Sequence, residues 1–430
     1  MRLLLVLLTL SLAGIDVIAN DLLTLSDGRP VKTSQDWKSQ RSELLKLVVD
    51  RLYGSMPPKP TADAVEIKQL SDRLMADGKA RESLSVMRIR RGDSTATIRF
   101  GVVRPVTDNP VPVVIKNDRW IFDLSSMPVG KKRDQYASQK RQEEFERIRD
   151  LALERGYAIC KFNREDVAMD VATSRETGVL AMYPDHGWGA LAAWAWVYQP
   201  LIDHLLSTGH FDAERIMATG HSRGGKAALA AAIFDSRITI TAPSASGSGG
   251  TGSWAHFTVG GNRQTAQNLA TSHAHWVSRQ LATVAENPGF DGHVLQALVA
   301  PRGLINTQGG DDGLANPRGT RMMFDASKPV FDLLGARLPA ATHWRPGGHG
   351  HLFVDWVALL DYADAYFNRQ ALPARFNNWP VSSARTPLPD PLVFENGKRV
   401  QSEEDWRQRR VEIKKLLAHY QYGSMPPPPE

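Results

Sequence analysis

A serine between glycines is the residue of this chain best suited to do chemistry. Residues 220–224 read Gly-His-Ser-Arg-Gly. The short apolar stretch 215–219 before them is typical of a buried strand, and the alanine-rich stretch 226–232 after them is typical of a helix. A serine on such a tight strand-to-helix turn is held exposed at the helix N-terminus, and the glycines let the backbone segments approach closely. The pattern predicts that Ser222 is a nucleophile.

An activated serine needs a histidine as general base and an acid that orients it, and after a turn of this kind the acid comes first in the chain. A strand-like stretch ends in a glycine-rich loop that carries Asp311 and Asp312. Residues 342–351 read as a loop with three histidines, of which His349 lies between glycines. We expect His349 to be the base. The histidines could also bind a metal, but no further Cys, Asp or Glu stands at ligand spacing, so we expect none.

The sequence around these residues resembles the glucuronoyl esterases, a family of carbohydrate esterases. The resemblance rests on the elbow GHSRGGK, on WGALAAWAWVYQPLIDHL before it, on GLANPRG after the acid loop and on GGHGHLFVDWVALLDYADAYF near the end. It extends from about residue 41 to residue 367. It implies an α/β-hydrolase fold, a three-layer sandwich with a mostly parallel central sheet, together with a Ser-His-acid mechanism and no cofactor. Such enzymes cleave the ester that joins a glucuronic acid side group of xylan to a lignin alcohol.

The resemblance also implies roles for four residues beside the nucleophile. Arg223 is similar to the arginine that helps to form the oxyanion hole, and Lys226 to the lysine that hydrogen-bonds sugar hydroxyls. Trp276 aligns with the tryptophan that packs beside the sugar, and Gln264 stands where relatives often have a glutamate of the sugar site. Cationic donors next to the serine would stabilise an oxyanion and attract an acid sugar. Composition alone allows a solvated helix lysine at 226 and a core or lid tryptophan at 276.

The family pattern also indicates which residue is the acid of the triad, because this chain departs from the pattern at one place and matches it at another. Many relatives carry an acid after the strand that follows the elbow, but this chain has Ala245 there. The family pattern Asp-x-x-Ala-Asn-Pro falls on residues 312–317. The resemblance therefore favours Asp312 as the triad acid, with Asp311 as the alternative.

The N-terminus and the composition limit the location and the partners. Residues 1–19 combine a charged start, an apolar core and a small residue at a plausible cleavage site, so we expect a signal peptide rather than a stable membrane span, and a secreted or periplasmic protein. The net charge of +6 suits an anionic polysaccharide. The basic stretch 87–91 alternates like the solvated face of a strand, so we expect no nucleic-acid partner. The single cysteine, Cys160, excludes an internal disulfide.

The remaining patterns predict an α/β protein. An amphipathic helix is expected at 37–53, and a GxGxxG match at 247–252 lacks a helix start, so we expect a loop beside the active site there. Two strands are expected to form an antiparallel edge that leads into a mostly parallel sheet. The expected strands lie at 84–90, 95–104 and 111–115 and near residues 158, 216, 238 and 304, and the expected helices lie near residues 145, 194, 228 and 323.

The N-terminal segment recurs at the end of the chain. Residues 27–60 return without a gap as residues 396–429. We expect an esterase domain at 20–375, a linker rich in Pro, Ser and Asn at 376–391, and a partial repeat at 392–430. An isolated helix of this length is marginal in water, so the repeat must dock on a surface to be ordered.

Together these patterns predict an exported serine carboxylic ester hydrolase, acting as a monomer on glucuronoxylan or lignin-carbohydrate esters. The glutamine at 264 leaves an acetyl or feruloyl xylan esterase open as an alternative. Hydrolase folds can also lose their triads, which leaves a non-catalytic glycan-binding relative open.

Overall fold

The computed structural model of the chain describes residues 21–75, 78–119, 138–256, 264–378 and 390–418. The chain divides into two compact units, Met1–Asn378 and Trp379–Glu430. Phe376 is buried and Asn377 exchanges hydrogen bonds with Thr342, so the first unit continues past the expected boundary at residue 375. The expected signal peptide and most of the expected linker lie outside the described residues.

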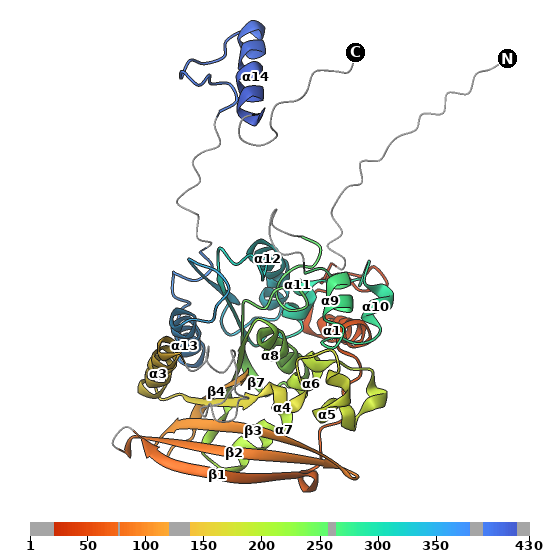
Figure 1. The fold of residues 1–430 in the computed structure, drawn as a ribbon, viewed down its shortest axis with the longest axis vertical. Helices are drawn as coiled ribbons and strands as arrows, with labels where there is room; N and C mark the ends of the chain where they lie inside the picture. Colours follow the sequence, from red (N-terminus) through yellow and green to blue (C-terminus); the bar gives the residue numbers. More distant parts are fainter. Residues whose placement is uncertain (1–20, 76–77, 120–137, 257–263, 379–389, 419–430) are drawn as a thin grey trace, which may run out of the picture. The chain divides into compact units, whose positions relative to one another are not determined.

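A nine-stranded sheet forms the centre of the first unit, in the order β1-β2-β3-β5-β4-β6-β7-β8-β9 (Figure 1). Strands β1, β2 and β3 pair antiparallel, β3 also meets β5 antiparallel, and all the other pairings are parallel. The strands are β1 (Val65–Met75), β2 (Ala80–Arg91), β3 (Ser94–Pro105), β4 (Val111–Asp118), β5 (Ala158–Asn163), β6 (Phe211–His221), β7 (Ile238–Ser244), β8 (Gly303–Gly309) and β9 (Ala341–Arg345).

Helices cover both faces of the sheet because successive strand residues point to opposite sides. Val113 and Ile115 of β4 join the core that α6 and α8 cover, whereas Val114 joins the core that α3 and α13 cover. The helices are α1 (Ser34–Val48), α3 (Gln139–Glu154), α4 (Arg164–Val167), α5 (Gly178–Met182), α6 (Ala190–Trp196), α7 (Tyr198–Ser207), α8 (Arg223–Phe234), α9 (Ala266–Ser272), α10 (Leu281–Val284), α11 (Gly292–Ala297), α12 (Pro317–Leu333), α13 (Phe353–Phe367) and α14 (Glu403–Leu417). The result is a three-layer sandwich with a mostly parallel sheet.

Two expectations about the elements need correction. Residues 342–351 are not a loop throughout, because the first of them belong to strand β9, which pairs with β8. Its sequence, Ala-Thr-His-Trp-Arg, is too short and too polar to show a strand pattern. The edge strand β1 was not expected at all, since most of its residues are exposed and its apolar alternation ends after Ile67. The expected helix at 37–53 is present as α1, which continues in a π-helical turn as far as Tyr53.

The second unit repeats the local structure of the chain's beginning. Helix α14 begins at a Ser402 cap, as α1 begins at a Thr33 cap, and each cap forms reciprocal hydrogen bonds with an aspartate three residues on. Val48 at the end of α1 is fully buried, whereas its counterpart Leu417 in α14 is exposed. The repeat therefore keeps an apolar position that only packing against another surface would cover, and its docking stays a prediction.

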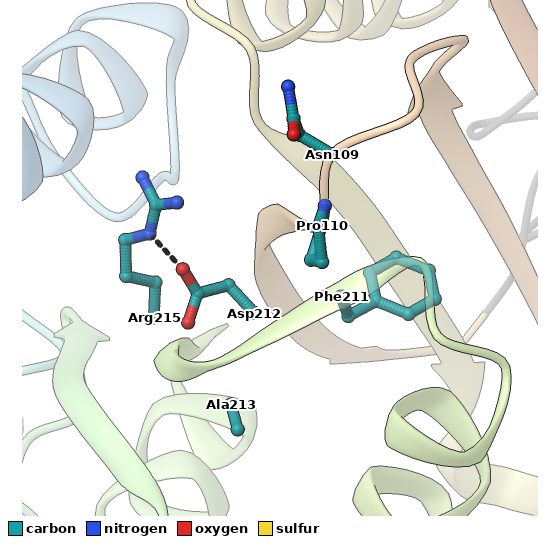
Figure 2. A pocket seen from close by; sticks show the side chains of 6 residues that line it. All are labelled: Asn109, Pro110, Phe211, Asp212, Ala213 and Arg215. Atoms are coloured by element: carbon teal, nitrogen blue, oxygen red, sulfur yellow. Dashed lines mark hydrogen bonds and ion pairs between the residues drawn. The ribbon is translucent and has the colours of Figure 1, made fainter.

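A hollow at the start of strands β4 and β6 lies away from the predicted chemistry. Figure 2 shows Asn109, Pro110 and Phe211 around it, with Arg215 directed at Asp212. Arg215 Nε donates to Asp212 Oδ2 over 2.6 Å. The nucleophile candidate instead follows the carboxyl end of β6, so the two places lie at opposite ends of that strand.

Candidate active site

Ser222 lies at the turn between β6 and α8. Its backbone has φ 57° and ψ −122°, a region that costs a non-glycine residue about 1–3 kcal/mol. The backbone at Gly220 lies so close to that at Gly224 that no side chain fits between them. A Cβ at Gly220 would lie only 2.3 Å from the carbonyl oxygen of Gly224. The N–H of Ser222 donates to Ser244 O over 2.8 Å, which ties the turn to β7. The strand, the tight turn and the helix predicted around this serine are all present.

His349 and Asp312 form a hydrogen-bonded pair. His349 Nδ1 lies 2.8 Å from Asp312 Oδ2, and the side chain of Asp312 is fully buried. The second carboxylate oxygen of Asp312 accepts from the backbone N–H groups of Leu314 and Ala315, each at 3.0 Å. A carboxylate can only accept, so Nδ1 carries the proton and Nε2 offers a lone pair. The ring of His349 lies 4.4 Å from that of His221, the residue before Ser222.

Asp311, the alternative acid, has a different contact. Its Oδ2 accepts from Gly347 N–H over 3.0 Å, and its own N–H donates to Gly347 O over 3.1 Å. Asp311 therefore ties the acid loop to the histidine loop without reaching the imidazole. Ala245 is buried, and its methyl group offers no acceptor.

A buried arginine holds the backbone on both sides of His349. Arg345 Nη1 donates to Gly348 O over 3.2 Å, and Nη2 donates to Gly350 O over 2.8 Å. Its Nε donates to Asp355 Oδ2 over 2.9 Å, so the charge is paired inside the protein. Burial raises the pKa of Asp355, and the charge of Arg345 acts in the opposite direction. Sequence patterns did not reveal Arg345, because its role depends on which carbonyl groups the folded loop turns toward it.

Lys226 is buried, so the solvated helix lysine allowed by composition is wrong. Its side chain lies in α8, and its Nζ donates to Ser246 O, to Ser248 O at 2.6 Å and to Gln264 Oε1 at 3.0 Å. Burial, followed by the charge of Arg223, lowers the pKa of Lys226 to about 7, whereas the three acceptors favour its ammonium form. Two of the acceptors are fixed backbone carbonyls, which leaves the Gln264 bond as the one a ligand could replace.

Arg223 and Trp276 lie together at the start of α8. The guanidinium carbon of Arg223 lies 4.7 Å from the centroid of the Trp276 ring, a cation–π contact. Trp276 is buried, and the ring of His273 also lies against it at 4.1 Å. A carboxylate that sequence analysis did not single out, Asp170, contacts both Arg223 and Trp276. No pattern marks Asp170 in the sequence, because its partners come from distant segments.

A cavity of about 250 Å³ borders His349 on the side of α3 and α13. Its lining includes His221, His351 and the buried Lys161. Burial lowers the pKa of Lys161 to about 7, while the charge of Asp118 acts in the opposite direction. Polar groups therefore line a cavity that His349 borders.

Cys160 lies buried in β5, and burial raises the pKa of its thiol. Among the helices of the described ranges, none is long and apolar enough to cross a membrane.

The mostly parallel sheet, the serine turn at its carboxyl end and the acid–histidine pair after later strands define the class of α/β-hydrolases. The profile of the family described as "Glucuronyl esterase, fungi" matches residues 87–335, more than half of the chain. The chain belongs to the glucuronoyl esterase family.

The chain is also similar to individual glucuronoyl esterases in sequence and in structure. The chain is 28% identical over 367 residues to 4-O-methyl-glucuronoyl methylesterase 1 of Phanerochaete chrysosporium, an alignment that covers 80% of this chain and 67% of the relative. It is similar in structure to a glucuronoyl esterase of Teredinibacter turnerae, with a TM-score of 0.71, 25% identity, and coverage of 81% of this chain and 89% of that one. A glucuronoyl esterase of Caldicellulosiruptor kristjansonii gives a TM-score of 0.65 and 27% identity, covering 81% of this chain and 90% of that one.

Proposed function

We propose that this protein hydrolyses glucuronoyl esters, which join the glucuronic acid side groups of xylan to lignin alcohols, with Ser222, His349 and Asp312 as its catalytic triad. The observation that carries the proposal is the hydrogen bond between His349 and the buried Asp312, beside the serine turn. Membership of the family and the printed activity of the Phanerochaete relative support the substrate class.

The proposed reaction follows from the tautomer of His349. Its Nε2 lone pair takes the proton of Ser222 as Oγ attacks the ester carbonyl, and Asp312 stabilises the resulting imidazolium. His349 then gives this proton to the leaving alcohol. Water hydrolyses the acyl-enzyme by the same steps in the opposite direction.

The developing oxyanion needs donors at the serine turn. The N–H that follows a nucleophile on such a turn is one such donor, and here it belongs to Arg223. The guanidinium of the same residue adds positive charge, which is worth most in a site that excludes water.

Selectivity for an acid sugar is assigned to the cations beside the serine. Lys226 donates to a sugar hydroxyl when the substrate displaces Gln264 Oε1, since the other two acceptors of Lys226 belong to the backbone. Gln264 and Trp276 complete the proposed sugar site.

An acetyl or feruloyl xylan esterase is the second candidate, because Gln264 stands where relatives often carry a glutamate. The test compares kcat/KM on benzyl glucuronate and on benzyl acetate, two esters of the same alcohol. A higher value on the glucuronate ester is expected, a preference for acetate assigns the protein to the second candidate, and turnover of neither ester rejects both.

Export and the monomeric state are part of the same proposal. The signal-like composition of residues 1–19 supports export. Mass spectrometry of protein collected outside the cytoplasm tests it, and a mature chain that retains residue 1 contradicts it. Size-exclusion chromatography with light scattering tests the monomer.

A further inference from the structure

Asp170 receives four side-chain donors, two on each oxygen. Its Oδ1 accepts from Trp276 Nε1 over 2.7 Å and lies 3.1 Å from His275 Nε2. Its Oδ2 accepts from Arg119 Nη2 over 2.8 Å and forms an ion pair with Arg223. Only 2% of the carboxylate side chain is exposed. One buried group therefore contacts the arginine and the tryptophan of the proposed site at once.

The charge state of Asp170 suits this arrangement. Burial alone would raise its pKa, but the hydrogen bond from His275 and the charge of Arg223 hold the pKa well below its usual range. The carboxylate can only accept, so Nε2 of His275 donates to it. Arg119 and Arg223 carry like charges and meet at the same oxygen, so Asp170 also offsets their repulsion.

From these contacts we propose that Asp170 is a positioning residue that fixes Arg223 and Trp276 in one geometry. The guanidinium beside the oxyanion and the aromatic ring of the proposed sugar site are then held in place by the same carboxylate. This inference rests on the proposed function of the serine site. Asp170 acts through its neighbours, so removing its charge should change both the rate and the binding of the sugar ester.

Asparagine cannot replace this carboxylate, because its amide has one acceptor oxygen instead of two. If that oxygen faces Trp276 and His275, the NH2 group faces two guanidinium groups. If it faces the guanidinium groups, the NH2 group faces Trp276 Nε1, which can only donate. Either orientation displaces at least one partner, and a shift of about 1 Å in a positioning group can cost about a hundredfold in rate.

The first experiment measures kcat and KM of Asp170→Asn on benzyl glucuronate and p-nitrophenyl acetate. We expect kcat on both esters to fall about tenfold to a hundredfold, with KM for the glucuronate ester raised about threefold or more. The matched control is Asp166→Asn. Asp166 is a neighbouring carboxylate that also pairs with an arginine, Arg99, but lies outside the site. The control should keep kcat and KM within about twofold, and an Asp170→Asn enzyme that is folded and equally unchanged overturns the proposal.

Trp276→Phe provides a second test in case Asp170→Asn does not fold. The substitution keeps a smaller aromatic ring beside Arg223 and removes the indole N–H that donates to Asp170 Oδ1. We expect kcat on p-nitrophenyl acetate to fall severalfold, although an acetyl group has no sugar to touch this residue. Unchanged acetate turnover would mean that Trp276 and Arg223 are not linked through Asp170.

The two esters separate this inference from the proposed function. If the unmodified enzyme turns over acetate but not glucuronate, the proposed substrate is wrong, and the acetate measurements still decide the role of Asp170. Turnover of neither ester overturns both. Normal glucuronate turnover with unaffected variants overturns the inference alone.

Discussion

Replacing Asp312 with asparagine is expected to abolish most activity by reversing the tautomer of His349. Asp312 Oδ1 is held by two backbone N–H groups at 3.0 Å, so the amide oxygen of the variant must stay there. The amide NH2 then takes the place of Asp312 Oδ2, which lies 2.8 Å from His349 Nδ1 in the unmodified protein. It donates to Nδ1, and the ring proton moves to Nε2. The base can then no longer accept the proton of Ser222.

The size of the effect follows from this geometry. The wrong tautomer in a serine triad costs about 10⁴ in kcat, which corresponds to roughly 5.5 kcal/mol in the barrier. Asp311→Asn provides the matched control, since Asp311 is exposed and one amide oxygen suffices to accept from Gly347 N–H. Its kcat should fall less than about threefold.

The assay is stopped-flow or steady-state hydrolysis of benzyl glucuronate by both variants, with thermal melts to show that each is folded. The KM of Asp312→Asn should change little, because Asp312 contacts the base and not the substrate. A greater loss of kcat in Asp311→Asn than in Asp312→Asn would refute the reasoning and move the acid by one residue.

Three further predictions concern other residues of the site. Ser222→Ala should remain folded and lose about a millionfold in kcat; near-normal turnover would show that another group is the nucleophile. Lys226→Ala should raise KM for the glucuronate ester more than for acetate. The pKa of Lys226 is lowered to about 7, so its ammonium form is lost as the pH rises above that value. The KM of the unmodified enzyme for the glucuronate ester should therefore rise above about pH 7, whereas the KM of the variant should not change there. Parallel pH profiles of the two KM values would contradict this role of Lys226. Arg345→Lys should lower kcat about tenfold to a hundredfold with KM unchanged, since one ammonium group cannot reach Asp355 and both carbonyls beside His349. Kinetics like those of the unmodified enzyme would show that the loop around His349 keeps its conformation without these hydrogen bonds.

The sequence predicts the parts of this protein that depend on neighbouring residues. The turn around Ser222 is encoded within seven residues, and the strand before it and the helix after it have distinct compositions. The alternation of strands and helices also predicts the mostly parallel sheet. The resemblance to a family favoured Asp312 over Asp311, and the structure pairs Asp312 with His349.

Features that depend on packing could not be predicted in this way. Lysine is normally a surface residue in a helix, and only the folded chain surrounds Lys226 with three acceptors. Asp170 lies far in sequence from the side chains that it contacts. Arg345 lies within ten residues of its partners, but no recognisable spacing shows which carbonyl groups the folded loop turns toward it. Strand β9 owes its conformation to pairing with β8, because its own residues show no strand pattern.

The backbone of Ser222 has a consequence for the evolution and engineering of this chain. Its positive φ is a conformation that glycine adopts freely and serine does not. A glycine at this position would relax the turn and delete the nucleophile in a single step. Selection for thermal stability alone therefore favours Ser222→Gly, a substitution that removes the activity. Any library screened for stability has to be screened for turnover at the same time.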